Sequence, residues 1–245
     1  MTSPGTNVTT PSRLSIIIPA YNEEATIRAV VEKVRSVDAL GLEKEVVVVD
    51  DRSTDGTRAA LEAIPGIVPV FHERNLGKGG AVKSGIRAAT GDVFIIQDAD
   101  LEYDPNDYGR LLQPIAHGQA EFVLGSRFRL RKLRFFGHGK SPFFTHYVGN
   151  KLIVWLTNLL YGHDATDYEG CYKAFTRGLA EAVPIEADGF EYDNELVCKA
   201  LRRGYRIMEV PISYHPRSYS EGKKITWKHG VRMVWTILKW RVRTF

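Results

Sequence analysis

The sequence has little cysteine and few other features that mark a specialised class of protein. Its two cysteines among 245 residues are Cys171 and Cys198, which form no C-x-x-C pair and have no histidine at zinc-ligand spacing. This pattern excludes a cysteine-based zinc site and a scaffold built on many disulfides. We expect both thiols to lie in or near the core, with a single disulfide between them as the open alternative.

Long apolar runs and targeting signals are also absent. No window of about 18 residues is both apolar and uncharged, so no transmembrane helix is expected. The longest apolar stretch, residues 143–161, is interrupted by a lysine and by other polar side chains. Residues 1–12 are rich in Thr, Ser, Pro and Gly and lack the basic start and apolar centre of a secretory signal. We expect them to be a disordered tail.

The composition is that of an ordinary globular protein, with 44% hydrophobic and 25% charged residues. The net charge of +4 is small, so the placement of the basic residues matters more than their number, and no nucleic-acid partner is expected. There is no internal repeat and no linker. We therefore expect one α/β domain over residues 13–225 and a C-terminal helical segment over residues 226–245.

Apolar runs that alternate with helical patterns predict the fold class. Strands are predicted at residues 14–18, 45–49, 67–71, from 93, and at 122–125. The first helix is predicted to be capped by Asn22 and to run to residue 37. Strands and helices that alternate in this way form a mostly parallel sheet flanked by helices. A later helix is predicted at residues 192–203 and a strand at residues 206–210.

The chain is organised around the strand that begins at Val93 and runs into Asp98, Asp100 and Glu102. Ligands of open α/β sheets bind just past the carboxyl ends of such strands. An extended chain would point Asp98 and Asp100 the same way, where they repel each other unless a cation lies between them. Such oxygen ligands suit Mg²⁺ or Mn²⁺, which bridge a protein to the phosphates of its substrate. The alternative is a strand followed by an Asp-rich turn.

Two more polar clusters are expected at the same edge of the sheet. Asp50 and Asp51 follow the second strand, where a carboxylate can accept hydrogen bonds from a ribose or a base. Capping of the next helix is an equally strong interpretation. Lys78 lies in a glycine-rich loop, residues 77–80, whose backbone could approach a phosphate. The loop matches neither the P-loop nor the dinucleotide-binding pattern, so by itself it indicates a glycine-rich turn.

Basic and aromatic residues are interleaved at two places. Residues 127–136 combine phenylalanines with Arg127, Arg129, Arg131, Lys132 and Arg134. A basic run is usually a solvated face, but exposed phenylalanine beside arginine suits an anionic membrane surface or a lipid phosphate. Residues 226–245 mix three tryptophans with basic residues, which predicts an amphipathic helix lying in an interface. A helix packed on the core is the alternative.

A late loop adds cations where a diphosphate could be held. His215, Arg217, Lys223 and Lys224 follow the last predicted strand. Cations placed there could stabilise the charge on a leaving diphosphate. No Ser-His-Asp or Cys-His pair stands out in the sequence, so nothing indicates a nucleophilic mechanism of that kind.

Taken together, four motifs resemble the family 2 glycosyltransferases, which have the GT-A fold. They are IPAYNEE at residues 18–24, VDDRSTDGT at 49–57, NLGKGG at 75–80 and QDAD at 97–100. Each motif alone is weak, but their order and spacing together are specific. Within the family the chain most resembles the dolichyl-phosphate mannose synthase group of polyprenyl-phosphate glycosyltransferases, through residues 125–127, 167–175 and 217–224.

The resemblance implies a role for each matching residue. The nucleotide would be bound by Pro19, Ala20, Tyr21, Glu23, Asp50, Asp51, Lys78 and Asp98. The metal, Mg²⁺ or Mn²⁺, would be held by Asp98, Asp100 and Glu102, although relatives often have glutamine at the last position. The catalytic set would be Asp100, Arg127, Arg217 and Lys224, with Lys223 standing where relatives often have serine. The lipid acceptor or membrane would be met by Arg129, Arg131, Lys132 and Arg134.

The resemblance also implies a reaction. A hexose would pass with inversion from a nucleotide-sugar to a polyprenyl phosphate, with GDP-mannose as the first candidate donor and a UDP-sugar as the next. A phosphomonoester has a second pKa of about 6 and is already anionic at neutral pH, so it needs no general base. The alternative is a UDP-sugar and a hydroxyl acceptor in surface or cell-wall glycan synthesis. That reaction needs a base, which Asp167 or Glu169 could supply.

Other classes fit less well. The QxxRW motif of processive polymer synthases is absent, and so is the glycine-rich N-terminal signature of sugar-phosphate nucleotidyltransferases. A catalytically silent binding module is disfavoured by the intact pair of Asp98 and Asp100. We expect a cytoplasmic enzyme that is peripheral on the cytoplasmic face of the membrane.

Overall fold

The computed structural model describes residues 11–129, 144–215 and 227–245. A seven-stranded sheet forms its centre, with the strand order β3-β2-β1-β4-β6-β5-β7. The strands are β1 (Arg13–Ala20), β2 (Glu43–Asp50), β3 (Val68–Phe71), β4 (Val93–Ile96), β5 (Phe122–Ser126), β6 (Lys173–Thr176) and β7 (Ile207–Pro211). Strand β6 runs antiparallel to both of its neighbours, and the other pairs are parallel. The predicted mostly parallel sheet is confirmed.

Burial explains why the central strands form where they do. Strand β4 is buried at all four positions, and β1 and β2 each bury a run of consecutive apolar residues. A strand covered on both faces needs such a continuous run, which is the pattern that predicted these strands. Because β2, β1 and β4 are parallel neighbours, their carboxyl ends meet at one edge of the sheet, as expected.

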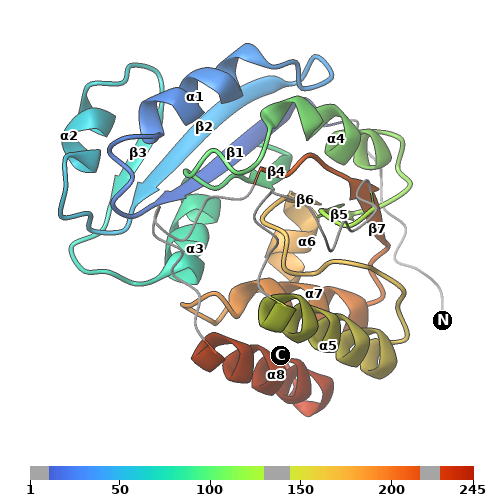
Figure 1. Ribbon diagram of the computed structural model, residues 1–245. Coiled ribbons are helices and arrows are strands. Elements are labelled where there is room, and N and C mark those ends of the chain that lie inside the picture. Colours follow the sequence, from blue (N-terminus) through green and yellow to red (C-terminus); the bar gives the residue numbers. More distant parts are fainter. Residues whose placement is uncertain (1–10, 130–143, 216–226) are drawn as a thin grey trace.

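Helices cover both faces of the sheet (Figure 1). One face carries α1 (Ile27–Ser36), α2 (Thr57–Glu62) and α4 (Tyr108–Ala116), and a short 3₁₀ turn, Pro105–Asp107, precedes α4. The other face carries α3 (Lys78–Ala88), α6 (Arg177–Ala182) and α7 (Tyr192–Arg202). Ile27, Val30, Val31 and Val34 of α1 are all buried, as the predicted helix face requires.

Two further helices, α5 (Phe144–Tyr161) and α8 (Trp227–Val242), lie outside α7 (Figure 1). They join α7 through a second small core of Ile153, Cys198, Met233, Ile237 and Trp240. Cys171 and Cys198 are both buried and unbridged, so the interpretation of core thiols is confirmed and the disulfide alternative is wrong. No helix in the described ranges has the length and apolar character needed to cross a membrane.

One local prediction was wrong, two elements were missed, and one prediction stays untested. Helix α1 begins at Ile27, and the predicted cap, Asn22, instead accepts a hydrogen bond from the backbone N–H of Thr54 at 2.8 Å. Strand β6 and helix α6 were not predicted, because a strand of four residues that begins with a lysine carries little apolar pattern. The predicted tail at residues 1–12 lies mostly outside the described residues.

Candidate active site

The carboxylates after β4 are brought together by a turn and not by an extended strand. The chain leaves strand conformation after Ile96, and Leu101 adopts a left-handed φ of 61°, which is uncommon for a leucine. The backbone N–H of Glu102 donates to Asp100 Oδ1 at 3.1 Å. Burial, together with the charges of Asp98 and Glu102, raises the pKa of Asp100 to about 7. The predicted proximity of Asp98 and Asp100 is therefore present, with a different local geometry.

Lys78 faces this turn from the start of α3. Its Nζ lies 2.6 Å from Asp98 Oδ1, and both side chains are largely buried. Burial opposes the charge of Lys78, but the Asp98 carboxylate outweighs it and raises the pKa of Lys78 well above its usual value. The lysine that was predicted to lie near the nucleoside therefore contacts the proposed metal and diphosphate region.

Gly77, the N-cap of α3, and Gly79 in its first turn let this helix approach the loop that precedes α7. Gly77 has a φ of 86°, and a Cβ there would lie 2.6 Å from the carbonyl oxygen of Asp188. A Cβ on Gly79 would lie 2.5 Å from the carbonyl oxygen of Ala187 and 2.9 Å from Cβ of Tyr192. The predicted glycine-rich loop is therefore mostly the first turn of α3, which begins at Lys78, and packing requires its glycines.

The predicted nucleoside residues lie at the ends of β1 and β2. Pro19 and Ala20 end β1. Tyr21 and Glu23 follow, with Tyr21 exposed and Glu23 half-buried. Asp50 is buried and accepts a hydrogen bond from Ser53 N–H at 3.0 Å, which closes the turn after β2. Helix α2 begins after Gly56 without a side-chain cap, so the capping interpretation is wrong. Their part in nucleotide binding stays a prediction.

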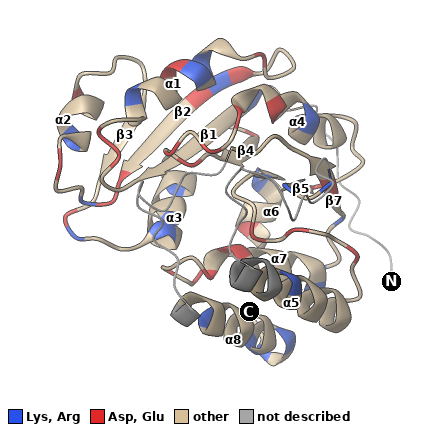
Figure 2. Cartoon of the chain, in the orientation of Figure 1, with Lys and Arg blue, Asp and Glu red and all other residues tan. Residues whose placement is uncertain are grey.

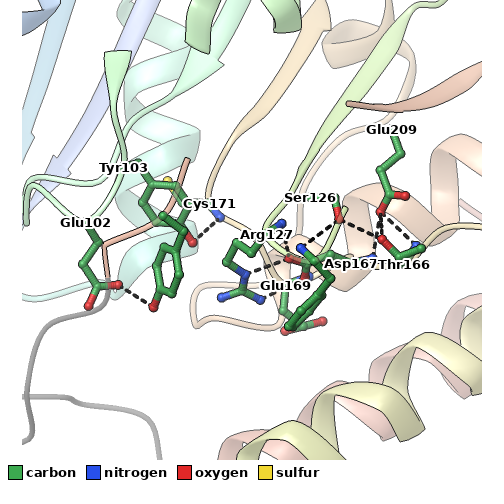
Figure 3. A network of polar contacts seen from close by, with 12 residues as sticks. Glu102, Tyr103, Ser126, Arg127, Thr166, Asp167, Glu169, Cys171 and Glu209 are labelled. Atoms are coloured by element: carbon green, nitrogen blue, oxygen red, sulfur yellow. Dashed lines mark hydrogen bonds and ion pairs between the residues drawn. The ribbon is translucent and has the colours of Figure 1, made fainter. Parts of the chain in front are cut away.

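A second polar centre follows β5 (Figure 3). The guanidinium of Arg127 donates from Nε to Asp167 Oδ2 at 2.7 Å and from Nη2 to Oδ1 at 2.9 Å. Burial alone would raise the pKa of Asp167, but the Arg127 guanidinium more than offsets this and holds it below its usual range. Because both oxygens of this buried carboxylate accept from Arg127, Asp167 is poorly placed to take a proton from an acceptor.

Glu209 of β7 supports the same centre. Its Oε1 accepts hydrogen bonds from the N–H groups of Thr166 and Asp167, both at 2.8 Å, and from the Thr166 hydroxyl at 2.9 Å (Figure 3). Arg129, predicted to meet the acceptor or the membrane, lies with Nε 3.3 Å from Glu209 Oε2. Glu209 therefore fixes the loop that carries Asp167.

The start of α7 forms another wall of the site; the helix was predicted at residues 192–203, but its place beside the site was not. Lys173 is fully buried, and its Nζ lies 2.7 Å from Asp193 Oδ1. Asn194 donates to Glu169 Oε1 at 2.7 Å. Burial and the Asp193 charge raise the pKa of Glu169 to about 7. Asp193 and Glu195 lie in the first turn of the helix, where acidic residues are favoured, but nothing local shows that this end faces Asp98 and Glu169.

The carboxylates after β4 fit a metal bound partly by substrate. In the described part of the chain, no set of three or more Asp, Glu, His or Cys side chains is arranged to hold a metal alone. Glu102 Oε2 accepts a hydrogen bond from the Tyr214 hydroxyl at 2.9 Å. Asp98 and Asp100 still repel each other, as the raised pKa of Asp100 shows. Mg²⁺ and Mn²⁺ commonly bind through one or two carboxylates plus phosphate oxygens and water, which suits this pair.

The remaining predicted residues lie outside the described ranges. These are Arg131, Lys132 and Arg134 of the basic-aromatic segment, and Arg217, Lys223 and Lys224 of the late loop. The described chain ends before that loop at His215, whose backbone N–H donates to the carbonyl oxygen of Glu102 at 2.8 Å. The late loop therefore starts directly beside the proposed metal turn.

Comparison with known proteins gives a consistent family match. The family model described as glycosyl transferase family 2 matches residues 15–183. The low-salt glycan biosynthesis hexosyltransferase Agl6 of Haloferax volcanii is 30% identical over 224 residues, which cover 88% of this chain and 52% of Agl6. The UDP-N-acetylglucosamine–dolichyl-phosphate N-acetylglucosaminyltransferase of Methanococcus voltae is 28% identical over 244 residues, which cover 91% of this chain and 94% of that enzyme. This chain thus spans about half of the first relative and nearly all of the second.

A solved structure confirms the GT-A fold. The glucosyl-3-phosphoglycerate synthase of Mycobacterium tuberculosis, in complex with Mn²⁺, UDP and phosphoglyceric acid, superposes with a TM-score of 0.72 at 22% identity. The match covers 100% of this chain and 86% of that one. Another crystal structure of the same synthase contains Mg²⁺ and UDP. At this identity the likeness concerns the fold.

Proposed function

The chain belongs to glycosyl transferase family 2, and from this premise we propose that it transfers a sugar from a nucleotide-sugar to a polyprenyl phosphate. The acceptor phosphate oxygen would attack the anomeric carbon from the face opposite the diphosphate. The bond from that carbon to the diphosphate oxygen breaks, the sugar inverts, and the nucleoside diphosphate leaves. This is the reaction that the resemblance to the polyprenyl-phosphate group implies.

The observation that carries the proposal is the pairing of Arg127 with Asp167. A hydroxyl acceptor must lose a proton to a base, whereas a phosphate acceptor does not. Both oxygens of Asp167 accept from the Arg127 guanidinium, and the pKa of Asp167 is held low. The pairing holds Arg127 in place as a cation that would meet an anionic acceptor or leaving group. It also occupies Asp167, which is one of the two candidate bases.

The leaving group would be stabilised from the β4 turn. Asp98 and Asp100 would hold Mg²⁺ or Mn²⁺, which supplies positive charge to the diphosphate when bound. Lys78 and Arg127 would add fixed positive charge nearby, and Arg217 and Lys224 would add more from the late loop. Cations positioned in this way act mainly by stabilising the charge that develops on the leaving oxygen.

The donor has two candidates. The sequence resemblance favours GDP-mannose. The Methanococcus voltae relative is named for UDP-N-acetylglucosamine and dolichyl phosphate, and the solved structures contain UDP, which favours a UDP-sugar. Both kinds of donor therefore belong in the first assay.

A lipid acceptor also gives a reason for the outer surface of α5 and α8. Apolar side chains point outward from both helices: Leu152, Trp155, Leu159, Val231, Trp235, Leu238 and Val242. Trp155 is 58% and Trp235 66% exposed, and neither helix contains Asp or Glu. Figure 2 shows Lys and Arg on the same helices. An exposed apolar face on helices that carry basic and no acidic residues suits an anionic leaflet, so we propose that α8, with α5, is the interfacial part of a peripheral enzyme.

A flotation assay tests this surface. We expect the protein to float with anionic liposomes at low salt and to lose most of that binding in the variant Trp155→Glu/Trp235→Glu. The control is Leu40→Glu/Val68→Glu, which changes two exposed apolar residues away from α5 and α8. Equal flotation of both variants would exclude α5 and α8 as the membrane contact.

A donor screen tests the proposed reaction. The protein, Mn²⁺ or Mg²⁺ and a short polyprenyl phosphate are incubated with radiolabelled GDP-mannose, UDP-glucose, UDP-galactose or UDP-N-acetylglucosamine. Metal-dependent movement of label from one donor into the organic phase is the expected result. A water-soluble labelled product without lipid product would refute the proposed acceptor.

One observation favours the hydroxyl-acceptor alternative. Glu169 has a pKa raised to about 7, which is the range a general base needs at neutral pH. Glu169→Gln separates the two reactions. Transfer to a phosphate acceptor should change little in this variant, whereas transfer to a hydroxyl acceptor should fall by a factor of about 10² or more.

A further inference from the structure

A buried histidine links helix α3 to the carboxylate after β2. His72 Nδ1 lies 2.7 Å from Asp51 Oδ1, and His72 Nε2 lies 2.9 Å from the hydroxyl oxygen of Ser84. The His72 and Asp51 side chains are 8% and 5% exposed. No motif in the sequence marks this histidine, which follows β3 by one residue.

The hydrogen bonds around His72 define one direction. Arg87 Nη2 donates to the Ser84 hydroxyl oxygen at 2.9 Å, and this hydroxyl is the partner of His72 Nε2. The Asp51 carboxylate only accepts hydrogen bonds, so His72 Nδ1–H donates to it. The charged groups that face His72 in this network are therefore Asp51 from the end of β2 and, through Ser84, Arg87 from α3.

Asp51 in turn holds the glycine-rich loop. Its Oδ1 also accepts from Leu76 N–H at 2.7 Å, and its Oδ2 accepts from Gly77 N–H at 2.8 Å. Asn75 Nδ2 donates to the Asp51 carbonyl oxygen at 3.0 Å. Each carboxylate oxygen has two lone pairs, so His72 and Leu76 fill Oδ1, while among the described residues only Gly77 donates to Oδ2, which leaves one of its lone pairs.

Lys78 directly follows Gly77 and contacts Asp98. The path from His72 to the proposed diphosphate region is thus short: His72 orients Asp51, Asp51 holds the N–H groups of Leu76 and Gly77, and Gly77 starts the helix whose first residue is Lys78. A one-ångström error in such a loop would misplace both the lone pair and the cation.

We propose that His72 is a positioning residue of the nucleotide subsite. It fixes the Asp51 carboxylate so that the remaining lone pair of Oδ2 faces the nucleoside of the donor and Lys78 faces the diphosphate. The proposal rests on the nucleotide-sugar part of the proposed function and does not depend on the acceptor.

Two amide variants separate a positioning role of His72 from simple packing. The amide nitrogen of asparagine falls where His72 Nδ1 lies, so His72→Asn keeps the donor to Asp51 and loses Ser84. The amide of glutamine reaches the position of Nε2, so His72→Gln keeps Ser84 and loses the donor to Asp51. Both variants replace a buried ring by a smaller polar side chain, so we expect similar losses of thermal stability.

Binding of UDP and of GDP, each with Mn²⁺, is measured by calorimetry for the wild type and both variants. For the diphosphate that the wild type binds, we expect His72→Asn to bind within about threefold of the wild type and His72→Gln to bind about tenfold or more weakly, since it loses a hydrogen bond to a charged group. Equal weakening in both variants, in step with their melting temperatures, would overturn the proposal. Binding of neither diphosphate by the wild type would also overturn it. Failure to use a polyprenyl phosphate would refute only the proposed acceptor.

Discussion

Replacing Asp167 by asparagine tests whether this carboxylate is a counter-ion or a base. The side chain of Asp167 is fully buried, and that of Arg127 is 17% exposed. Asparagine keeps the shape but presents an NH₂ group to a guanidinium that can only donate. Removal of one partner of a buried ion pair costs about 3–5 kcal/mol. At roughly 2–4 °C per kcal/mol for a chain of this size, the melting temperature should fall by about 6–20 °C.

The assay is urea unfolding of the wild type and of Asp167→Asn, with the midpoint and slope fitted separately. Asp164→Asn is the matched control, since the same substitution three residues earlier falls on an exposed side chain and should change stability by less than about 0.5 kcal/mol. Arg127→Gln/Asp167→Asn should regain part of the loss, because no unpaired charge remains buried. A stable Asp167→Asn protein whose sugar transfer falls more than about a hundredfold would refute the counter-ion account and make Asp167 a base.

Two more predictions follow from the same wall of the site. Between pH 4.5, the usual pKa of a glutamate, and pH of about 7, the raised pKa of Glu169, the folded state keeps a proton on Glu169 that the unfolded state has lost. The wild type should therefore lose stability as pH rises through this window. Glu169→Gln should remove the Glu169 part of that loss and leave the part due to Asp100, whose pKa is also raised to about 7. Urea unfolding at pH 5 and pH 8 measures the difference between the two proteins, expected at roughly 1–3 kcal/mol; an unchanged pH dependence would contradict the raised pKa of Glu169. Gly79→Ala should destabilise the protein by about 1–3 kcal/mol through its contact with the backbone of Ala187, whereas Gly149→Ala, which meets no atom within 4 Å, should not. Equal stability of the two alanine variants would contradict the packing explanation of the glycine loop.

The sequence was most informative where burial is continuous. The apolar runs of β1, β2 and β4 are read directly from the chain because both faces of these strands are covered. Strand β6 was missed because its first residue is Lys173, whose burial depends on Asp193 from a distant helix. No local pattern carries that information.

The same distinction applies to the site. Proximity of Asp98 and Asp100 could be predicted from their spacing, although the turn that produces it could not. The sequence predicted Asn22 as a helix cap. Its side-chain oxygen instead accepts a hydrogen bond from the N–H of Thr54, which lies 32 positions away in sequence. Asp167 and Glu169 looked equivalent as bases, and tertiary contacts give them opposite pKa shifts: Arg127 lowers the first, and burial with Asp193 raises the second.

The most direct test of the account is a paired acceptor assay. The protein receives one radiolabelled donor, Mn²⁺, and either a polyprenyl phosphate or the corresponding polyprenol, and label is measured in the lipid product. The account predicts label in the polyprenyl phosphate and none above background in the polyprenol, because only the phosphate arrives without a proton to lose. Transfer to the polyprenol, abolished by Glu169→Gln, would contradict the proposed acceptor and establish base-assisted transfer to a hydroxyl group.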